Sequence, residues 1–167
     1  VVSCVADPRR APGPADAVTA LAQARSAGVQ ALVGEQGAAW AERWRDADLA
    51  VHGDDELTLA LRHALFHVLG AAPEEGEAAV GPRAMSGQSY AGHVLWDADV
   101  YVLPTLVGVQ PGAARAMLEY RLRRLPAARR FAEETGHDGA RFPWESGRDG
   151  GDVTPRLVRR SGHIVPI

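Results

Sequence analysis

The sequence predicts an all-α chain in which several helices follow one another and are joined by polar loops. Leu57, Leu61 and Leu65 recur at the spacing that places apolar side chains on one face of a helix. Two further stretches, 35–48 and 112–136, repeat this spacing. Serial helices whose connecting loops carry the chemically active residues are the pattern of helical barrels.

Taken in order along the chain, the expected elements are a strand at 1–5, a connector at 8–14, helices at 16–27, 35–48 and 57–70, a loop at 71–87, helices at 93–109 and 112–136, and a loop at 139–167. Asp54 and Asp55 stand where acidic residues stabilise the start of the third helix. Pro104 is expected to bend the fourth helix, and Pro126 to interrupt the last one before it stops at Gly136.

Composition argues against several classes of protein. The formal net charge is −3, so no overall positive field attracts nucleic acid or an anionic membrane surface. No apolar run reaches the roughly 20 residues that a membrane-spanning helix requires. The single cysteine, Cys4, cannot form an intrachain disulfide, and the absence of lysine excludes Schiff-base chemistry within this chain.

Two other patterns are interpreted as structural. The basic stretch 121–130 alternates arginines with apolar residues at helical spacing, which favours a solvated face of an amphipathic helix over a nucleic-acid site. His63 and His67 lie four residues apart, but Ala64 stands where a metalloprotease motif has glutamate, and no third ligand is apparent. We therefore expect no metal site, and no cofactor fingerprint is present.

Two pairs of adjacent residues each consist of a tryptophan followed by a carboxylate: Trp96 with Asp97, and Trp144 with Glu145. Saccharides present apolar C–H faces and a ring of hydroxyls, so a site that binds them needs an aromatic surface with carboxylate acceptors beside it. Each pair alone also fits a core tryptophan next to a helix-capping or ion-paired acid. The residue types leave both interpretations open.

Several segments occur in an order and spacing that resemble glycoside hydrolase family 65. These segments are Gly53-Asp54-Asp55-Glu56-Leu57, Ala60-Leu61-Arg62, Leu65-Phe66-His67, Gly92-His93 with Trp96-Asp97, and the run from Arg141 to Ser146. The family includes trehalose, kojibiose and maltose phosphorylases and also α-glucoside hydrolases. It is built on an (α/α)6 barrel behind an N-terminal β-sandwich and a helical linker.

The resemblance implies a division of the chain and a set of site residues. Residues 1–8 would be the tail of the sandwich, 9–49 the helical linker, and 50–167 the incomplete N-terminal part of the barrel, so we expect a fragment that covers the start of the catalytic domain. Trp96 and Asp97 would bind the glucosyl unit in the cleavage subsite. Trp144 and Glu145 would line the same pocket, and Arg141 completes the expected substrate-binding set.

Family chemistry is inverting. A glutamic acid protonates the glycosidic oxygen, while phosphate, or water activated by a carboxylate base, attacks the opposite face. The Gly-Pro-Asp-Glu motif that carries this acid in the family does not occur in this sequence. No catalytic residue is therefore assigned in this chain, and the isolated chain is expected to be inactive.

The resemblance to the hydrolase branch is carried by 142–146, 152–155 and 163–167, which favours hydrolysis of α-glucosidic bonds in small glucosyl disaccharides such as trehalose. One alternative is a disaccharide phosphorylase that uses inorganic phosphate as co-substrate and releases glucose 1-phosphate. A second alternative is a non-catalytic remnant or a sugar-binding fragment. The expected location is cytoplasmic, and a homodimer of the complete enzyme is compatible with the resemblance.

Overall fold

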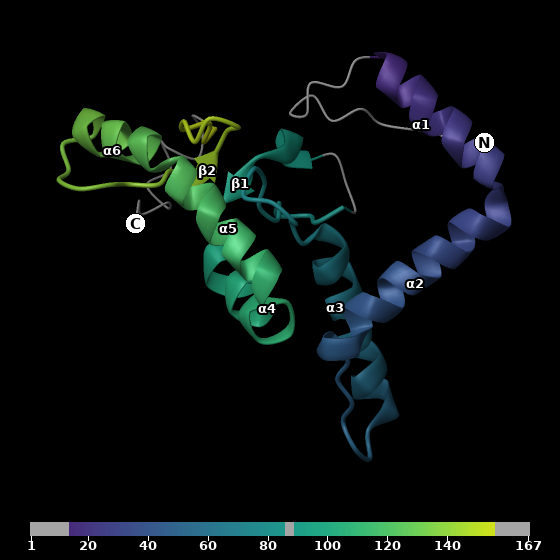
Figure 1. The fold of residues 1–167 in the computed structure, drawn as a ribbon. Coiled ribbons are helices and arrows are strands. Elements are labelled where there is room, and N and C mark those ends of the chain that lie inside the picture. The colour runs from purple at the N-terminus through teal and green to yellow at the C-terminus, as the bar shows by residue number, and fades with distance from the viewer. Residues whose placement is uncertain (1–13, 86–88, 156–167) are drawn as a thin grey trace. The chain divides into compact units, whose positions relative to one another are not determined.

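The computed structural model describes residues 14–85 and 89–155, and this part of the chain is mostly helical (Figure 1). The all-α prediction is confirmed. The expected strand at 1–5, nearly all of the connector and the segment 163–167 lie outside the described residues. The chain divides into two compact units, Val1–Arg45 and Asp46–Ile167.

The first unit contains α1 (Pro14–Ala27) and most of α2 (Val29–Ala47). Gly28 separates the two helices with φ of +82°, a left-handed conformation that a residue without Cβ adopts at little cost. The second helix therefore begins earlier than the predicted residue 35. Trp40 and Trp44 pack against each other on it, with ring centroids 6.4 Å apart.

The second unit carries the remaining elements. In chain order these are α3 (Asp55–Ala71), η2 (Ser89–Gly92), β1 (Val94–Leu95), η3 (Ala98–Val102), α4 (Leu103–Val109), α5 (Pro111–Arg123), α6 (Leu125–Glu134) and β2 (Glu145–Ser146). The start of α3 agrees with the acidic signal, because the Asp54 side chain accepts a hydrogen bond of 2.8 Å from the Leu57 amide.

The segment 93–109 is not the continuous helix that the sequence predicted. Its first residues form β1, which pairs with β2, and η3 is a single π-helical stretch that leads into α4. Pro104 lies in the first turn of α4, where its missing amide hydrogen is not needed, so it bends nothing. Pairing with a distant strand overrides the helical spacing of this stretch.

The predicted helix at 112–136 is two helices, α5 and α6, separated at Arg124. Pro126 is again a first-turn residue, so the interruption falls just before it. The helix ends near the predicted stop, since α6 closes at Glu134 and Gly136 has φ of +75°.

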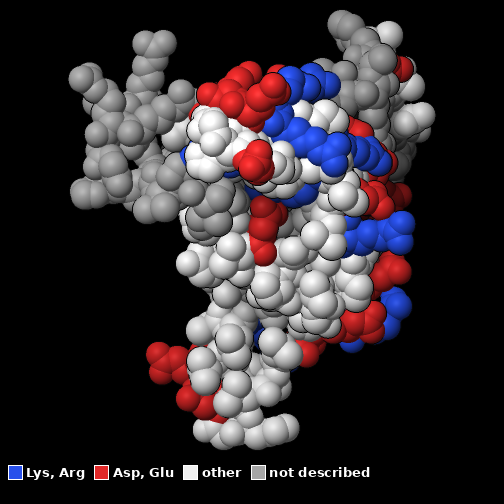
Figure 2. Space-filling view, turned by 90° about the vertical axis from the view of Figure 1, so that its left-hand side faces the viewer, with Lys and Arg blue, Asp and Glu red and all other residues white. Residues whose placement is uncertain are grey.

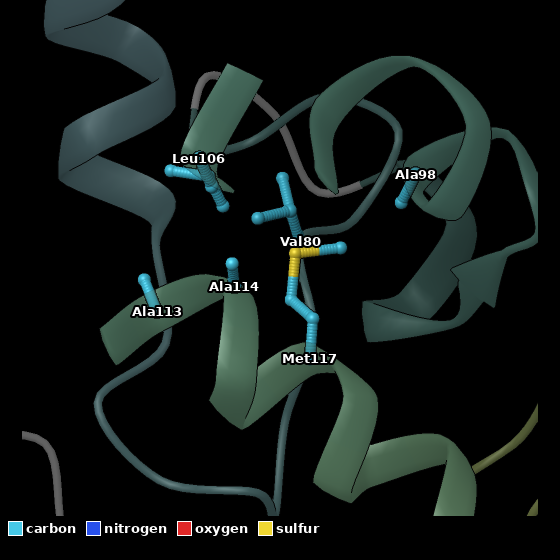
Figure 3. Packing of buried hydrophobic residues seen from close by; sticks show 6 residues of the cluster. All are labelled: Val80, Ala98, Leu106, Ala113, Ala114 and Met117. Carbon is cyan, nitrogen blue, oxygen red and sulfur yellow. The ribbon is translucent and has the colours of Figure 1, made fainter. Parts of the chain in front are cut away.

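The core of this unit lies where the loop after α3, η3, α4 and α5 meet (Figure 3). Leu106 of α4 and Met117 of α5 are fully buried, and the Met117 side chain reaches from α5 toward Val80. Small side chains on α5, Ala113 and Ala114, let the two helices approach closely. This packing fixes α5 as the element against which the loops of the unit are held.

Candidate functional site

The two aromatic–acid pairs come together in the structure. β1 and β2 pair antiparallel, with Leu95 opposite Glu145, and the Trp96 amide donates a hydrogen bond of 3.3 Å to the carbonyl of Trp144 (Figure 1). Trp96 directly follows β1 and Trp144 directly precedes β2, so both tryptophans lie at the same end of the short ladder. Both tryptophans are half-buried.

The first pair occupies a corner between β1 and η3. The carbonyl of Trp96 accepts from the amides of Asp99 and Val100, so the backbone on both sides of the ring is fixed. Asp97 is half-buried, and within the described part of the chain its carboxylate has no hydrogen bond or ion pair. A π-helical stretch directly after it is a feature that occurs frequently at functional sites. Among the described residues, the Asp97 carboxylate therefore has acceptor oxygens without a protein donor, and Asp97 directly follows Trp96 in sequence.

The second pair carries a buried carboxylate. The Glu145 side chain is 5% exposed, and its Oε1 lies 2.7 Å from Nδ1 of His93. Oε2 is buried and has no hydrogen-bond partner among the described residues. A buried carboxylate oxygen without a donor is energetically costly, so this atom is a candidate acceptor for a ligand hydroxyl.

His93 is held beside Glu145 by an unusual turn. Tyr90, Ala91 and Gly92 have φ of +69°, +48° and +77°, so three consecutive residues are left-handed, and two of them carry side chains. Such a conformation costs energy at non-glycine positions and is found most often where function needs it. The His93 amide closes the turn with a hydrogen bond of 2.7 Å to the Tyr90 carbonyl.

Arg141, the fifth predicted site residue, lies against α6. Its guanidinium carbon is 5.1 Å from the centroid of the Phe131 ring, and Nη1 is 3.3 Å from Nδ1 of His137. Its backbone amide donates to the Ala128 carbonyl. The structure thus joins Trp96, Asp97, Trp144 and Glu145 through one ladder, whereas the contacts of Arg141 hold it to the neighbouring helix.

Two arginines that the sequence assigned to a solvated helix face are buried instead. Arg121 is 8% exposed and Arg124 is 9% exposed. Their guanidinium groups are surrounded by carboxylate, hydroxyl and carbonyl oxygens, which compensate for the loss of water. The prediction was wrong for these two positions, although Arg123 does lie on the surface, paired with Glu77.

A signal for this burial was present in the sequence. The buried residues of α5 include Ala113, Met117, Tyr120 and Arg121, which follow the spacing of one helix face. Arg121 falls on that apolar face, so only a partner for its charge could explain its position. On the face of the unit that carries α6, the exposed charges of both signs are interleaved (Figure 2).

Other features of the described residues are separate from these pairs. A groove of about 410 Å³ is lined by His67, Val68, Val80, Gly81, Pro82, Arg83, Ala84 and Val102. Nε2 of His63 and Nε2 of His67 are 3.3 Å apart, and no group of three or more His, Cys, Asp or Glu in this part of the chain is arranged to hold a metal ion. No helix in 14–85 or 89–155 has both the length and the apolar character needed to cross a bilayer.

Comparisons with known proteins identify the family to which the chain belongs. Residues 62–165 match the model of the glycosyl hydrolase family 65 central catalytic domain. The chain is 40% identical over 114 residues to a kojibiose phosphorylase of Caldanaerobacter subterraneus subsp. tengcongensis, an overlap of 68% of this chain and 15% of that protein. It is 37% identical over 116 residues to a kojibiose hydrolase of Flavobacterium johnsoniae, covering 70% of this chain and 17% of that protein.

A solved structure shares the fold. It is named "Putative kojibiose phosphorylase from human microbiome", and it superposes with a TM-score of 0.72 at 26% identity, over 81% of this chain and 20% of that one. The predicted fold class, a partial all-α toroid, is therefore confirmed. The chain spans less than a fifth of the length of the two curated relatives.

Proposed function

This chain belongs to glycosyl hydrolase family 65, within the central catalytic domain, and from this premise we propose that the protein cleaves α-glucosidic bonds of small glucosyl disaccharides. Its relatives include both phosphorylases and hydrolases that act on such sugars. The observation that supports the proposal is the β1–β2 pairing, because it brings the backbone of Trp96 beside that of Trp144, and each tryptophan is followed in sequence by a carboxylate.

Each of these groups has a role in the proposed site. Trp96 and Trp144 pack against the apolar faces of the glucosyl unit, and the carboxylate of Asp97 accepts hydrogen bonds from its hydroxyls. Oε2 of Glu145, which has no partner among the described residues, accepts a further hydroxyl. Arg141 is proposed as a further donor to the saccharide. These contacts accelerate the reaction to the extent that they strengthen as the transition state forms.

Neither carboxylate is proposed as the general acid or base. Inverting cleavage requires an acid that protonates the leaving oxygen and a nucleophile on the opposite face of the sugar. Asp97 and Glu145 are proposed as binding groups, and the acid is proposed to lie in the remainder of the family domain. With water as nucleophile the reaction is hydrolysis, which is our first proposal, with a trehalose-like disaccharide as substrate. We propose no cofactor, a cytoplasmic location and a homodimer of the complete enzyme.

Phosphorolysis is the second candidate, because three kojibiose phosphorylases are among the relatives, at 40%, 36% and 39% identity. Inorganic phosphate would then replace water as the nucleophile, and glucose 1-phosphate would be released. Both reactions use the same glucosyl-binding groups. The residues described here therefore support the substrate class more directly than the choice of nucleophile.

The test is product analysis of the protein with its complete catalytic domain. It is incubated with trehalose, kojibiose, nigerose and maltose, each with and without inorganic phosphate. Glucose formed without phosphate supports hydrolysis, whereas glucose 1-phosphate formed only with phosphate supports phosphorolysis. Absence of both products with all four sugars would refute the proposal and favour a non-catalytic, sugar-binding role.

A further inference from the structure

One guanidinium group contacts residues that flank both aromatic–acid pairs. Nε of Arg121 donates to Oδ2 of Asp99 at 2.7 Å, Nη2 donates to the Leu95 carbonyl at 3.3 Å, and Nη1 donates to Oγ of Ser146 at 3.2 Å. Leu95 precedes Trp96, and Ser146 follows Glu145. Arg121 itself belongs to α5, whose Tyr120 hydroxyl also donates to the Gly147 carbonyl at 3.5 Å, directly after Ser146.

The geometry of arginine explains why this residue type is used. A guanidinium is planar, always charged and offers five N–H donors in fixed directions, so it bonds several acceptors at once and fixes the angles between them. Its carbon also lies 5.3 Å from the ring of Phe142, two residues before Trp144. Arg121 therefore holds β1, η3, β2 and the segment before β2 in a single arrangement.

We propose that Arg121 is a positioning residue for the saccharide site. It does not contact the sugar, but it fixes Trp96 and Asp97 in register with Trp144 and Glu145. The inference rests on the proposed function, since positioning matters only if these four residues act on one ligand. Displacement of a binding group by about 1 Å can reduce a rate by about a hundredfold, so loss of this anchor affects turnover more than stability alone would.

A matched control is available on the same helix face. Arg124 follows α5 directly, is 9% exposed, and donates to the carbonyls of Arg148, Tyr120 and Glu77. None of these acceptors adjoins either aromatic–acid pair. Both arginines are buried and make three hydrogen bonds each, so replacement of either by lysine should cost stability, and the consequence for the site should differ.

The experiment compares Arg121→Lys with Arg124→Lys in the protein with its complete catalytic domain. The melting temperature, kcat and KM are measured with the disaccharide that the unsubstituted protein cleaves. We expect kcat to fall by at least about tenfold in Arg121→Lys and by less than about twofold in Arg124→Lys, at similar losses of melting temperature. Equal changes of kcat in both variants would reduce Arg121 to a structural role and overturn the inference.

Two further measurements keep the inference open to refutation. If Arg121→Lys does not fold, Ser146→Ala removes one contact of the guanidinium, and an unchanged kcat in this variant overturns the inference. Amide hydrogen exchange at Trp96 gives a readout independent of turnover: exchange should accelerate in Arg121→Lys and not in Arg124→Lys. An unsubstituted protein that cleaves no sugar would refute the proposed function, whereas unchanged exchange would refute the positioning role alone.

Discussion

Replacement of Asp97 by asparagine tests the proposed saccharide site most directly. The substitution keeps the size and shape of the side chain and removes its charge. Asp97 is half-buried, and within the described residues it has no hydrogen-bond or ionic partner, so its oxygens are available to a ligand. Since no internal ion pair is lost, we expect little change in folding stability.

The size of the effect follows from the hydrogen bonds that are weakened. A hydrogen bond to a charged group contributes about 1.5–3 kcal/mol, and each 1.4 kcal/mol or so in a transition state changes a rate by about tenfold. A carboxylate can accept from two sugar hydroxyls at once. We therefore expect kcat/KM to fall by at least about a hundredfold, with most of the loss in kcat if the bonds strengthen in the transition state.

The assay measures initial rates with the disaccharide that the unsubstituted protein cleaves best. Asp138→Asn is the matched control. Asp138 is exposed on the loop after α6, so this substitution makes the same change of charge away from the proposed site. The control should keep its kcat/KM within about twofold. Near-normal kinetics of Asp97→Asn, at an unchanged melting temperature, would refute the reasoning and return Trp96 and Asp97 to a structural role.

Three further outcomes are expected. Met117→Ala should lower the free energy of unfolding of the complete protein by about 3 kcal/mol in a urea titration, because Met117 is fully buried. The control Met85→Ala, at an 80% exposed position, should change this free energy by less than about 0.5 kcal/mol. Equal effects of the two substitutions would contradict the described core. Burial raises the pKa of Tyr120 above its ordinary value of 10.0, so this tyrosine ionises first in the unfolded state and stability should fall as the pH rises above about 10. In melting curves recorded at several pH values, Tyr120→Phe should show a smaller fall of stability than the unsubstituted protein. Identical pH dependence of the two proteins would argue against this burial. Residues 1–167 produced alone should bind a hydrophobic dye and melt without a sharp transition, because apolar side chains such as Tyr101 and Leu122 are 70% and 66% exposed. A cooperative melt together with cleavage of a disaccharide would overturn this expectation.

The helices could be predicted from sequence because their signals are local. Asp54 caps the start of α3 through a hydrogen bond to a neighbouring amide, and Gly136 ends the helical conformation after α6 through its positive φ. Both signals need only neighbouring residues. The segment 93–97 could not be predicted in this way. A two-residue strand has no period of its own, and its partner β2 lies far along the chain, so a local pattern favoured a helix.

The site could be predicted in part. Residue type singled out Trp96, Asp97, Trp144 and Glu145 but left a structural interpretation open, and it was the resemblance to the family that assigned them to a saccharide site. Their meeting at one ladder depends on tertiary pairing, which spacing along the chain does not encode. The contact of His93 with Glu145 was missed for the same reason.

The placement of Arg121 explains why a site made of loops is attached to a helix that lies outside it. A helix satisfies its own backbone hydrogen bonds, so functional side chains gather on connecting segments, whose backbone groups need partners elsewhere. The Leu95 carbonyl is such a group, and the Asp99 side chain adds a carboxylate that needs a donor. An apolar side chain of α5 could pack against these two acceptors but not satisfy them. A buried arginine on the rigid, well-packed face of α5 supplies the donors and at the same time fixes the distance between the two pairs. The arrangement of the proposed site should therefore be sensitive to α5, an element that carries none of the residues proposed to bind the sugar.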